Sequence, residues 1–229
     1  MLLYRRLQFG NLIDMTVLDT RQYRSKQSQC GNPTDCPELL DVKRTMLGET
    51  QEKWLFDSLA DAKATWTIIG QQVPTFARDM ASVNAAARYS VDKWDGYAGA
   101  RNRLFAHLHQ AKVANPIVLS GDVHSHWCAD LKADFTRPTS PTIGVEFTNS
   151  SVTSGGDGSD VQPAWESLRR DNPHLTYHSN KRGYIACTAT ARTMTADFRI
   201  VDRVSVPDQP ARTARTMVVE AGRPGSMTS

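Results

Sequence analysis

A carboxylate and two imidazoles occur within five residues of this chain, in the segment SGDVHSHW at 120–127. Asp122 and His124 are two residues apart and follow Gly121, which lets the backbone approach a ligand closely. Neutral imidazole binds transition metals and a carboxylate favours harder cations, so the two side chains suit two different ions side by side. The alternative is that Asp122 caps a turn and that His124 and His126 are ordinary polar residues.

Two other chemistries are less favoured. Neither Ser120 nor Ser125 lies in the Gly-x-Ser-x-Gly elbow of a serine hydrolase. The glycine-rich run TSGGDG at 153–158 lacks the Lys and the Ser or Thr that complete a P-loop. We therefore expect this run to be a loop near a cleft rather than a nucleotide site.

The elements that must position these residues alternate between helix and strand in the middle of the chain. Apolar residues at helical spacing predict a helix over 49–63, behind an acidic first turn, and another over 97–113. Apolar runs at 65–73 and 116–120 predict buried strands. This order is typical of an α/β protein that binds ligands at the carboxyl ends of its strands, where the segment 120–127 begins.

The flanking regions predict further strands. Residues 7–19 predict one or two strand pieces, and the period-two alternation of 183–202 predicts an antiparallel hairpin or meander. A short helix is expected near 161–170 and another strand within 211–225, followed by a frayed end. The expected fold class is therefore a layered α/β (α+β) arrangement with an antiparallel region near the carboxyl terminus.

Composition limits the classes of partner. The 229 residues are 40% hydrophobic, which is enough for one sizeable core or two small ones. The net charge is +3 and the Lys and Arg residues are scattered, so no specific binding of nucleic acid is expected. No apolar run approaches the roughly 18 residues of a membrane span, and the first ten residues lack the apolar region of a signal peptide. Cys30 and Cys36 bracket a turn and form either a local disulfide or two free thiols.

GDVH at 121–124 resembles the last signature of the calcineurin-like metallophosphoesterases, usually Gly-His-x-His, in which both histidines bind a dinuclear metal centre. Asp122 in place of the first histidine is similar to the form in PhoD-like alkaline phosphatases. The resemblance extends through six segments: LDTRQYRS at 18–25, LGETQEKWLFDSLADAKATWTIIGQQV at 47–73, KWDGYAGARNRL at 93–104, VLSGDVHSHWCADLKADF at 118–135, VEFTNSSVTSGGDG at 145–158 and VVEAGRPG at 218–225. Together they identify the chain as a member of that family.

This resemblance implies a partial metallophosphoesterase sandwich, in which a β-sheet is flanked by helices, and the metal-dependent hydrolysis of small phosphoesters or phosphodiesters. It also implies a centre that contains Fe³⁺ and Ca²⁺. His124 would bind the iron-type ion, and the hard carboxylate of Asp122 would bind the neighbouring calcium. Gln72 is a third candidate metal ligand, because it ends a strand where related enzymes place a ligand histidine. The alternative for Gln72 is hydrogen bonding within its own loop.

His126 and Arg21 are the candidate catalytic residues, through contact with the phosphoryl group. His126 lies beyond the completed Gly-Asp-x-His motif, so a surface or packing role is the alternative. Arg21 follows a strand end, and its guanidinium offers two parallel donors to a phosphate. The alternative for Arg21 is a structural salt bridge near Asp19.

The resemblance covers only the carboxyl-terminal part of such an enzyme. Family members carry an upstream half with the other metal ligands and an export signal, which implies a periplasmic or extracellular location. We therefore expect residues 1–229 to be the carboxyl-terminal part of one phosphatase domain, with little or no activity alone and with exposed apolar surface that favours self-association. The alternative is an inactive fragment that binds metal weakly or serves only as an association module. The sequence does not predict the oligomeric state.

Overall fold

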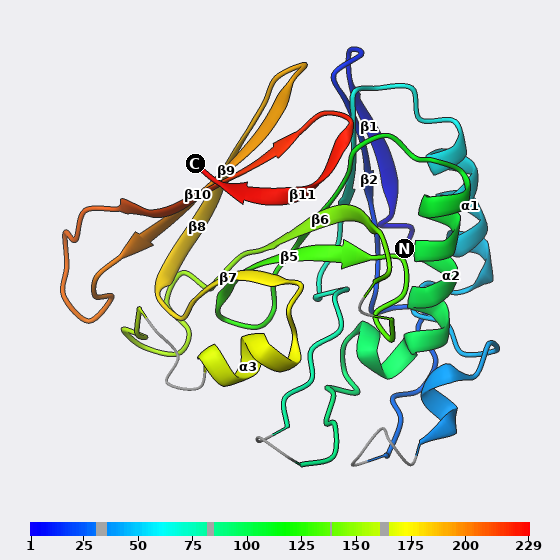
Figure 1. Cartoon of the computed structure of the whole chain (residues 1–229), viewed down its shortest axis with the longest axis horizontal. Helices are drawn as coiled ribbons and strands as arrows, with labels where there is room; N and C mark the ends of the chain where they lie inside the picture. Colours follow the sequence, from blue (N-terminus) through cyan, green and yellow to red (C-terminus); the bar gives the residue numbers. More distant parts are fainter. Residues whose placement is uncertain (31–35, 82–84, 138, 161–164) are drawn as a thin grey trace.

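The computed structural model describes residues 1–30, 36–81, 85–137, 139–160 and 165–229, which form three layers (Figure 1). The strands are β1 (Arg5–Phe9), β2 (Ile13–Val17), β3 (Trp66–Gly70), β4 (Pro116–Ser120), β5 (His126–Lys132), β6 (Thr142–Thr148), β7 (Leu175–Ser179), β8 (Arg182–Ala189), β9 (Thr193–Val201), β10 (Arg212–Glu220) and β11 (Arg223–Thr228). The helices are α1 (Glu49–Ala60), α2 (Ala98–Gln110) and α3 (Trp165–Asp171), with short 3-10 helices η2 (Pro37–Leu40) and η3 (Trp94–Tyr97).

The middle layer is a seven-stranded mixed sheet in the order β1-β2-β3-β4-β6-β5-β7. Helices α1 and α2 cover one face, and a four-stranded antiparallel sheet in the order β11-β10-β9-β8 lies against the other (Figure 1). Strands β2, β3, β4 and β6 are parallel, whereas β1 and β5 are antiparallel to their neighbours. The parallel strands therefore present their carboxyl ends at one edge.

The middle sheet is buried on both faces, which explains the continuous apolar runs of its central strands. Ile69 and Val118 point into the helix-side core, and Ile68 and Ile117 point into a second core between the two sheets. Phe198 of β9 is a fully buried member of this second core. The chain thus builds two cores on the two sides of one sheet.

The predicted α/β fold class is confirmed, because the predicted helices and the two apolar strands appear within a few residues of their expected positions. The expected frayed end is wrong: β11 runs to Thr228 and pairs with β10. Strands β5 and β7 were not expected, because both contain several polar residues. Strand β5 nevertheless lies between two neighbours, β6 and β7, inside the sheet. Among the described residues, no helix is both long enough and apolar enough to cross a bilayer.

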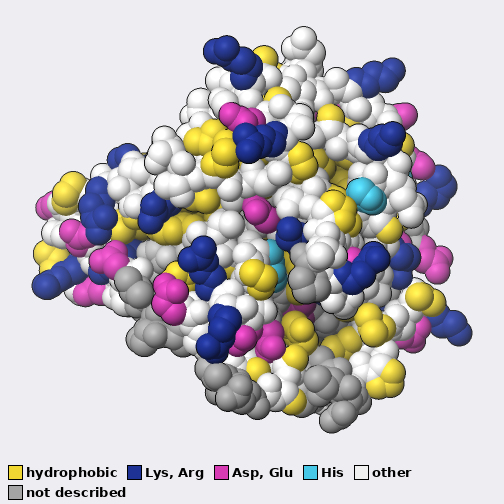
Figure 2. Space-filling view, in the orientation of Figure 1, with side chains coloured by type: hydrophobic (Ala, Val, Ile, Leu, Met, Phe, Trp, Pro, Cys, Tyr) yellow, Lys and Arg dark blue, Asp and Glu magenta, His cyan; other side chains and the backbone are white. Residues whose placement is uncertain are grey.

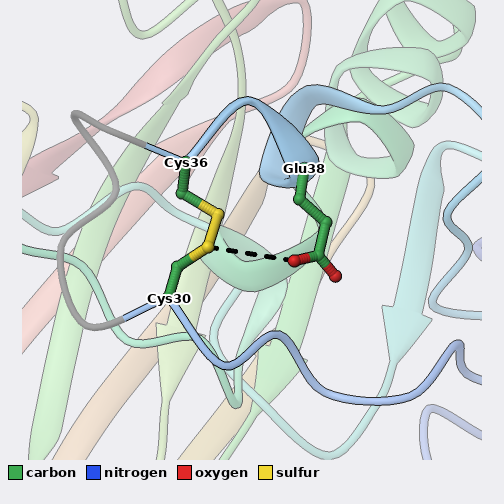
Figure 3. A group of neighbouring side chains, drawn as sticks. All are labelled: Cys30, Cys36 and Glu38. Carbon is green, nitrogen blue, oxygen red and sulfur yellow. Dashed lines mark hydrogen bonds between the residues drawn. A yellow bond between two sulfur atoms is a disulfide. The ribbon is translucent and has the colours of Figure 1, made fainter.

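Cys30 and Cys36 are joined by a disulfide, which decides between the two alternatives left open by the sequence (Figure 3). Glu38 lies beside the bridge, with its Oε2 atom 3.8 Å from Cys30 Sγ. The same carboxylate forms an ion pair with Arg44 and accepts a hydrogen bond from Ser28 Oγ (2.9 Å). The disulfide therefore fixes the start of η2 to the preceding loop.

Strand β1 is an edge strand that exposes large apolar side chains. Leu7 is 39% exposed and Phe9 is 57% exposed, and Leu2 and Leu3 beside them are also exposed. An open edge that carries apolar side chains promotes association between chains. We predict that the chain self-associates at high micromolar concentration and that Phe9→Lys shifts the population toward monomer in sedimentation velocity. An equally associated Phe9→Lys variant would contradict this prediction.

Candidate metal and phosphate site

The loops that follow β2, β3, β4 and β6 meet at the carboxyl edge of the middle sheet. Backbone hydrogen bonds continue the strand pairing into these loops: Leu18 N–H to Gly70 C=O (2.8 Å), Gln71 N–H to Leu119 C=O (2.9 Å) and Asn149 N–H to Ser120 C=O (2.8 Å). The loops are therefore anchored where they leave the sheet. The sheet therefore fixes the position of the first residues of each loop, and with them the direction of their side chains.

The loop after β4 presents Asp122 and His124 to solvent. Val123 N–H donates to Gly121 C=O (2.9 Å), which tightens the turn, and the left-handed residues Asp122 (φ 74°) and His124 (φ 52°) lie on either side of Val123. Val123 packs against the helix-side core, whereas both flanking side chains are exposed. One tight turn thus offers a carboxylate and an imidazole on the same surface.

Arg21 lies next to Asp122. Its Nη2 atom is 2.9 Å from Asp122 Oδ1, and its Nη1 atom is 3.2 Å from Asp92 Oδ1. Asp19 accepts the backbone N–H groups of Arg21 (2.9 Å) and Gln22 (3.0 Å), so it shapes the loop and leaves the guanidinium to other partners. The structure therefore brings Arg21 and Asp122 together in a salt bridge, and binding of a phosphoryl group by Arg21 stays a prediction.

Lys93 and Arg24 complete the charged surface around Asp122. Lys93 Nζ is 3.4 Å from Asp122 Oδ2, and Arg24 Nη1 is 2.9 Å from Asp92 Oδ1. Burial opposes ionisation of Asp92, but its contacts with Arg24 and Arg21 hold its pKa below the ordinary value. Asp92 is therefore a carboxylate, and the surface alternates positive and negative charge.

Gln72 has a structural function at this edge. Its Oε1 atom accepts hydrogen bonds from Thr20 N–H (2.8 Å) and Thr20 Oγ (2.6 Å), and its Nε2 atom donates to Leu18 C=O (2.8 Å). These bonds tie the loop after β3 to the loop after β2. Metal binding by Gln72 would require Thr20 to give up its bonds, so that role stays a prediction that this geometry does not favour.

His126 is not on the surface with Asp122 and His124. It is the first residue of β5 and is fully buried, with its ring edge against Phe198 at a centroid distance of 5.5 Å. Its Nδ1 atom accepts Ser150 N–H (3.3 Å) and its Nε2 atom has no hydrogen-bond partner among the described residues. Burial, together with the nearby Arg182 and His178, lowers the pKa of His126 to about 4, so the ring is neutral near pH 7. Its contact with phosphate stays a prediction, and this position favours the alternative packing role.

Glu146 of β6 lies beneath the site and is fully buried. Its carboxylate accepts hydrogen bonds from Ser120 Oγ (2.5 Å), from Phe76 N–H (3.1 Å) and from the backbone and hydroxyl of Thr75. Burial raises the pKa of Glu146 to about 7, although these donors favour the charged form. The network joins the end of β4, immediately before Gly121, to the loop after β3.

Arg182 holds the glycine-rich loop at 151–158 against the site. It is buried, and no carboxylate in the described part of the chain pairs with it. Its Nη atoms donate to Ser151 Oγ (3.0 Å) and Asn180 Oδ1 (2.6 Å), and the latter also accepts from Ser125 Oγ (3.1 Å). Gly155 has φ 89°, which side chains rarely adopt, so the loop favours glycine there. The run TSGGDG is thus a loop, as the sequence predicted, and its position near a cleft stays a prediction.

Comparison with known proteins identifies the family of this chain. A family model for the PhoD-like phosphatases matches residues 1–198. The chain belongs to the PhoD-like phosphatase family. It is 37% identical to alkaline phosphatase D of Bacillus subtilis (strain 168) over 226 residues, which covers 98% of this chain and 39% of that protein. A solved structure of PhoD matches all of this chain with a TM-score of 0.94 at 35% identity, and the match covers 44% of that structure.

The chain therefore spans less than half the length of these PhoD-like relatives. Among the described residues, the group of three potential ligand side chains that lie close together is Cys30, Cys36 and Glu38, in which both sulfurs form the disulfide. Asp122 and His124 belong to no such group within the described ranges. Because each ion needs about four to eight donors, these two residues could not complete a metal centre by themselves.

Sequence reasoning missed Lys93, Glu146 and Arg182 as neighbours of the candidate site. Lys93 lies in KWDGY, which carries no local signal of a site, and its partner Asp122 follows 29 positions later in another loop. Glu146 lies in the apolar strand TIGVEFT, where a charged residue at the centre of a buried run was the available signal. No local pattern marks Arg182, because its burial depends on a loop about thirty residues earlier in the chain.

Proposed function

We propose that this chain supplies the carboxyl-terminal part of a metal-dependent site that hydrolyses phosphate esters. Asp122 and His124 would bind the metal ions, and Arg21 would bind the phosphoryl oxygens. The observation that carries the proposal is the pairing of a carboxylate and an imidazole on one exposed turn, with a guanidinium 2.9 Å from that carboxylate. Membership of the PhoD-like phosphatase family supports the same reaction class.

The donors fit the proposed ions. The imidazole of His124 suits an iron-type ion, and the carboxylate of Asp122 suits Ca²⁺. When bound, such ions activate a water molecule and neutralise charge on the phosphoryl group. The contribution of this chain would be to hold Asp122 and His124 on a rigid turn and to orient the phosphoryl group through the fork of Arg21.

We also propose that the remaining ligands come from a part of the protein outside these 229 residues, so that this chain alone has little or no phosphatase activity. The partial ligand set and the 39% coverage of the Bacillus subtilis relative support this view. The substrates would be small phosphoesters or phosphodiesters. The disulfide between Cys30 and Cys36 supports an oxidising location, periplasmic or extracellular.

Metal titration tests the ligand assignment. We expect Asp122→Asn and His124→Asn each to weaken binding of Ca²⁺ or Fe³⁺ by about tenfold or more in calorimetric titrations of the purified chain. Asparagine is chosen because it tolerates the left-handed backbone at both positions. Asp57→Asn and His109→Asn, on exposed parts of α1 and α2, are matched controls that should leave the metal affinity unchanged.

Two results would contradict the proposal. The first is unchanged metal affinity in both site variants. The second, which concerns the partial site, is robust hydrolysis of a chromogenic phosphoester by the 229-residue chain alone, lost in Asp122→Asn.

A further inference from the structure

Asp122 is the shared partner of two cations that come from different loops. Arg21 contacts Oδ1 at 2.9 Å and Lys93 contacts Oδ2 at 3.4 Å, so each carboxylate oxygen has its own positive group. Within the described residues, Asp122 is the one carboxylate at ion-pair distance from Lys93. Arg21 has a second partner in Asp92, at 3.2 Å, which it shares with Arg24. Asp122 therefore shares one negative charge between Lys93 and Arg21.

Arg21 and Lys93 both lie on backbone segments that are fixed by hydrogen bonds and packing. The loop of Arg21 is fixed by Asp19, which accepts the backbone N–H of Arg21, and by the bonds between Gln72 and Thr20. Lys93 precedes η3, where Lys93 C=O accepts Gly96 N–H (2.9 Å) and Trp94 is buried. A Cβ at Gly96 would collide with the carbonyl of Val91, so this turn is closely packed. Arg21 and Lys93 thus form a positioned pair above the loop after β4.

We propose that Asp122 is an internal counter-ion that masks an anion-binding pair, Arg21 and Lys93, and that a metal ion on Asp122 frees this pair for a phosphoryl group. The inference rests on the proposed function, because it takes Asp122 to be a metal ligand. A carboxylate whose oxygens bind a divalent cation no longer neutralises its ammonium and guanidinium partners. The forked donors of Arg21 and the point charge of Lys93 then match the oxygens of a tetrahedral dianion. Loading with metal and binding of phosphate would therefore be coupled through one side chain.

The masking can be tested without any metal. Asp122→Asn removes the negative charge, keeps the shape of the side chain and suits the left-handed backbone at φ 74°. In the presence of a chelator, we expect this variant to bind inorganic phosphate about three- to tenfold more tightly than the unmodified chain, as measured by ³¹P NMR titration at low ionic strength. Asp122→Asn combined with Lys93→Gln, or with Arg21→Gln, should lose this gain.

Asp57→Asn is the matched charge control, because it raises the net charge by the same amount but releases only Lys53 on α1. Its phosphate affinity should equal that of the unmodified chain. Circular dichroism and thermal melting of every variant establish that the fold is intact. An unchanged phosphate affinity in Asp122→Asn would overturn the masking, and so would a gain that persists without Lys93 or that also occurs in Asp57→Asn.

A second arm adds Ca²⁺ in place of the chelator. The phosphate affinity of the unmodified chain should rise toward that of Asp122→Asn, and that of Asp122→Asn should stay nearly constant. If Ca²⁺ binds and leaves the phosphate affinity of the unmodified chain unchanged, the coupling is overturned while the ligand assignment stands. If Asp122→Asn binds Ca²⁺ as tightly as the unmodified chain, the proposed function fails instead. The phosphate titration in chelator still tests the masking independently.

Discussion

Glu146→Ala should lower the free energy of unfolding by about 3 to 5 kcal/mol. The substitution leaves Ser120 Oγ, Thr75 and Phe76 N–H without the carboxylate that accepts their hydrogen bonds in a fully buried position. Each buried donor without a partner costs about 1 to 3 kcal/mol. Urea denaturation followed by tryptophan fluorescence measures the change. Glu166→Ala, on the exposed face of α3, is the control and should stay within about 0.5 kcal/mol.

The pH dependence of the free energy of unfolding tests the ionisation of Glu146 separately from its packing. The pKa of Glu146 is raised to about 7 in the folded chain, above the ordinary value of 4.5. The folded state therefore holds a proton that the unfolded state has released, so this residue's contribution to stability falls as the pH rises between those two values. Glu146→Gln should lack that fall, and the difference in stability between the two proteins should change across this range. A constant difference would contradict the raised pKa.

Asp95→Ala should be about as destabilising as Glu146→Ala, at about 3 to 5 kcal/mol, for a different reason. Asp95 is buried in an ion pair with Arg101, which is buried too, and it also accepts Arg78 N–H (3.1 Å). Removal of Asp95 leaves the Arg101 guanidinium buried without a carboxylate partner. Thermal and urea unfolding measure the loss. Asp95 thus anchors η3, which follows Lys93, to α2 through Arg101.

The double variant Asp95→Ala with Arg101→Met tests the explanation. Because it removes the uncompensated charge together with its partner, it should be clearly more stable than Asp95→Ala alone. A double variant that is as unstable as the single variant would show that lost packing, rather than a buried charge, explains the effect.

Some elements were predictable because local patterns decide them. The runs TWTIIGQQV and PIVLS are apolar on both faces, as parallel strands between two layers must be, and they became β3 and β4. Strand β5 was not predictable, because its Asp130 is satisfied by Ser226, whose N–H and Oγ donate at 2.8 and 2.9 Å from 96 positions later in the chain. A strand whose polar groups find partners at such a distance carries no local signal of burial.

The candidate site divides in the same way. Asp122 and Arg21 were each predicted to follow the end of a strand, and the structure shows that both strands, β4 and β2, belong to one parallel set whose carboxyl ends share an edge. For His126 the sequence left phosphate contact and a packing role open, and the structure favours packing, since the chain turns into β5 at that position and buries the ring. Lys93 was out of reach, because an ion pair between separate loops depends on how both loops pack. Figure 2 shows Lys and Arg side chains spread among acidic ones on one face, so the distribution of charge does not distinguish Lys93 from other basic residues.

The left-handed backbone at Asp122 and His124 implies a trade-off between stability and ligand chemistry. Relative to glycine, a side chain in this conformation costs about 1 kcal/mol, although Asp and His adopt it more often than most residues. A redesign that optimised stability alone would therefore place glycine at both positions, and it would relax the turn while removing both donors. Gains in melting temperature at these two positions would then be a warning sign in any engineering of this scaffold, because the residues lost would be the two proposed metal ligands.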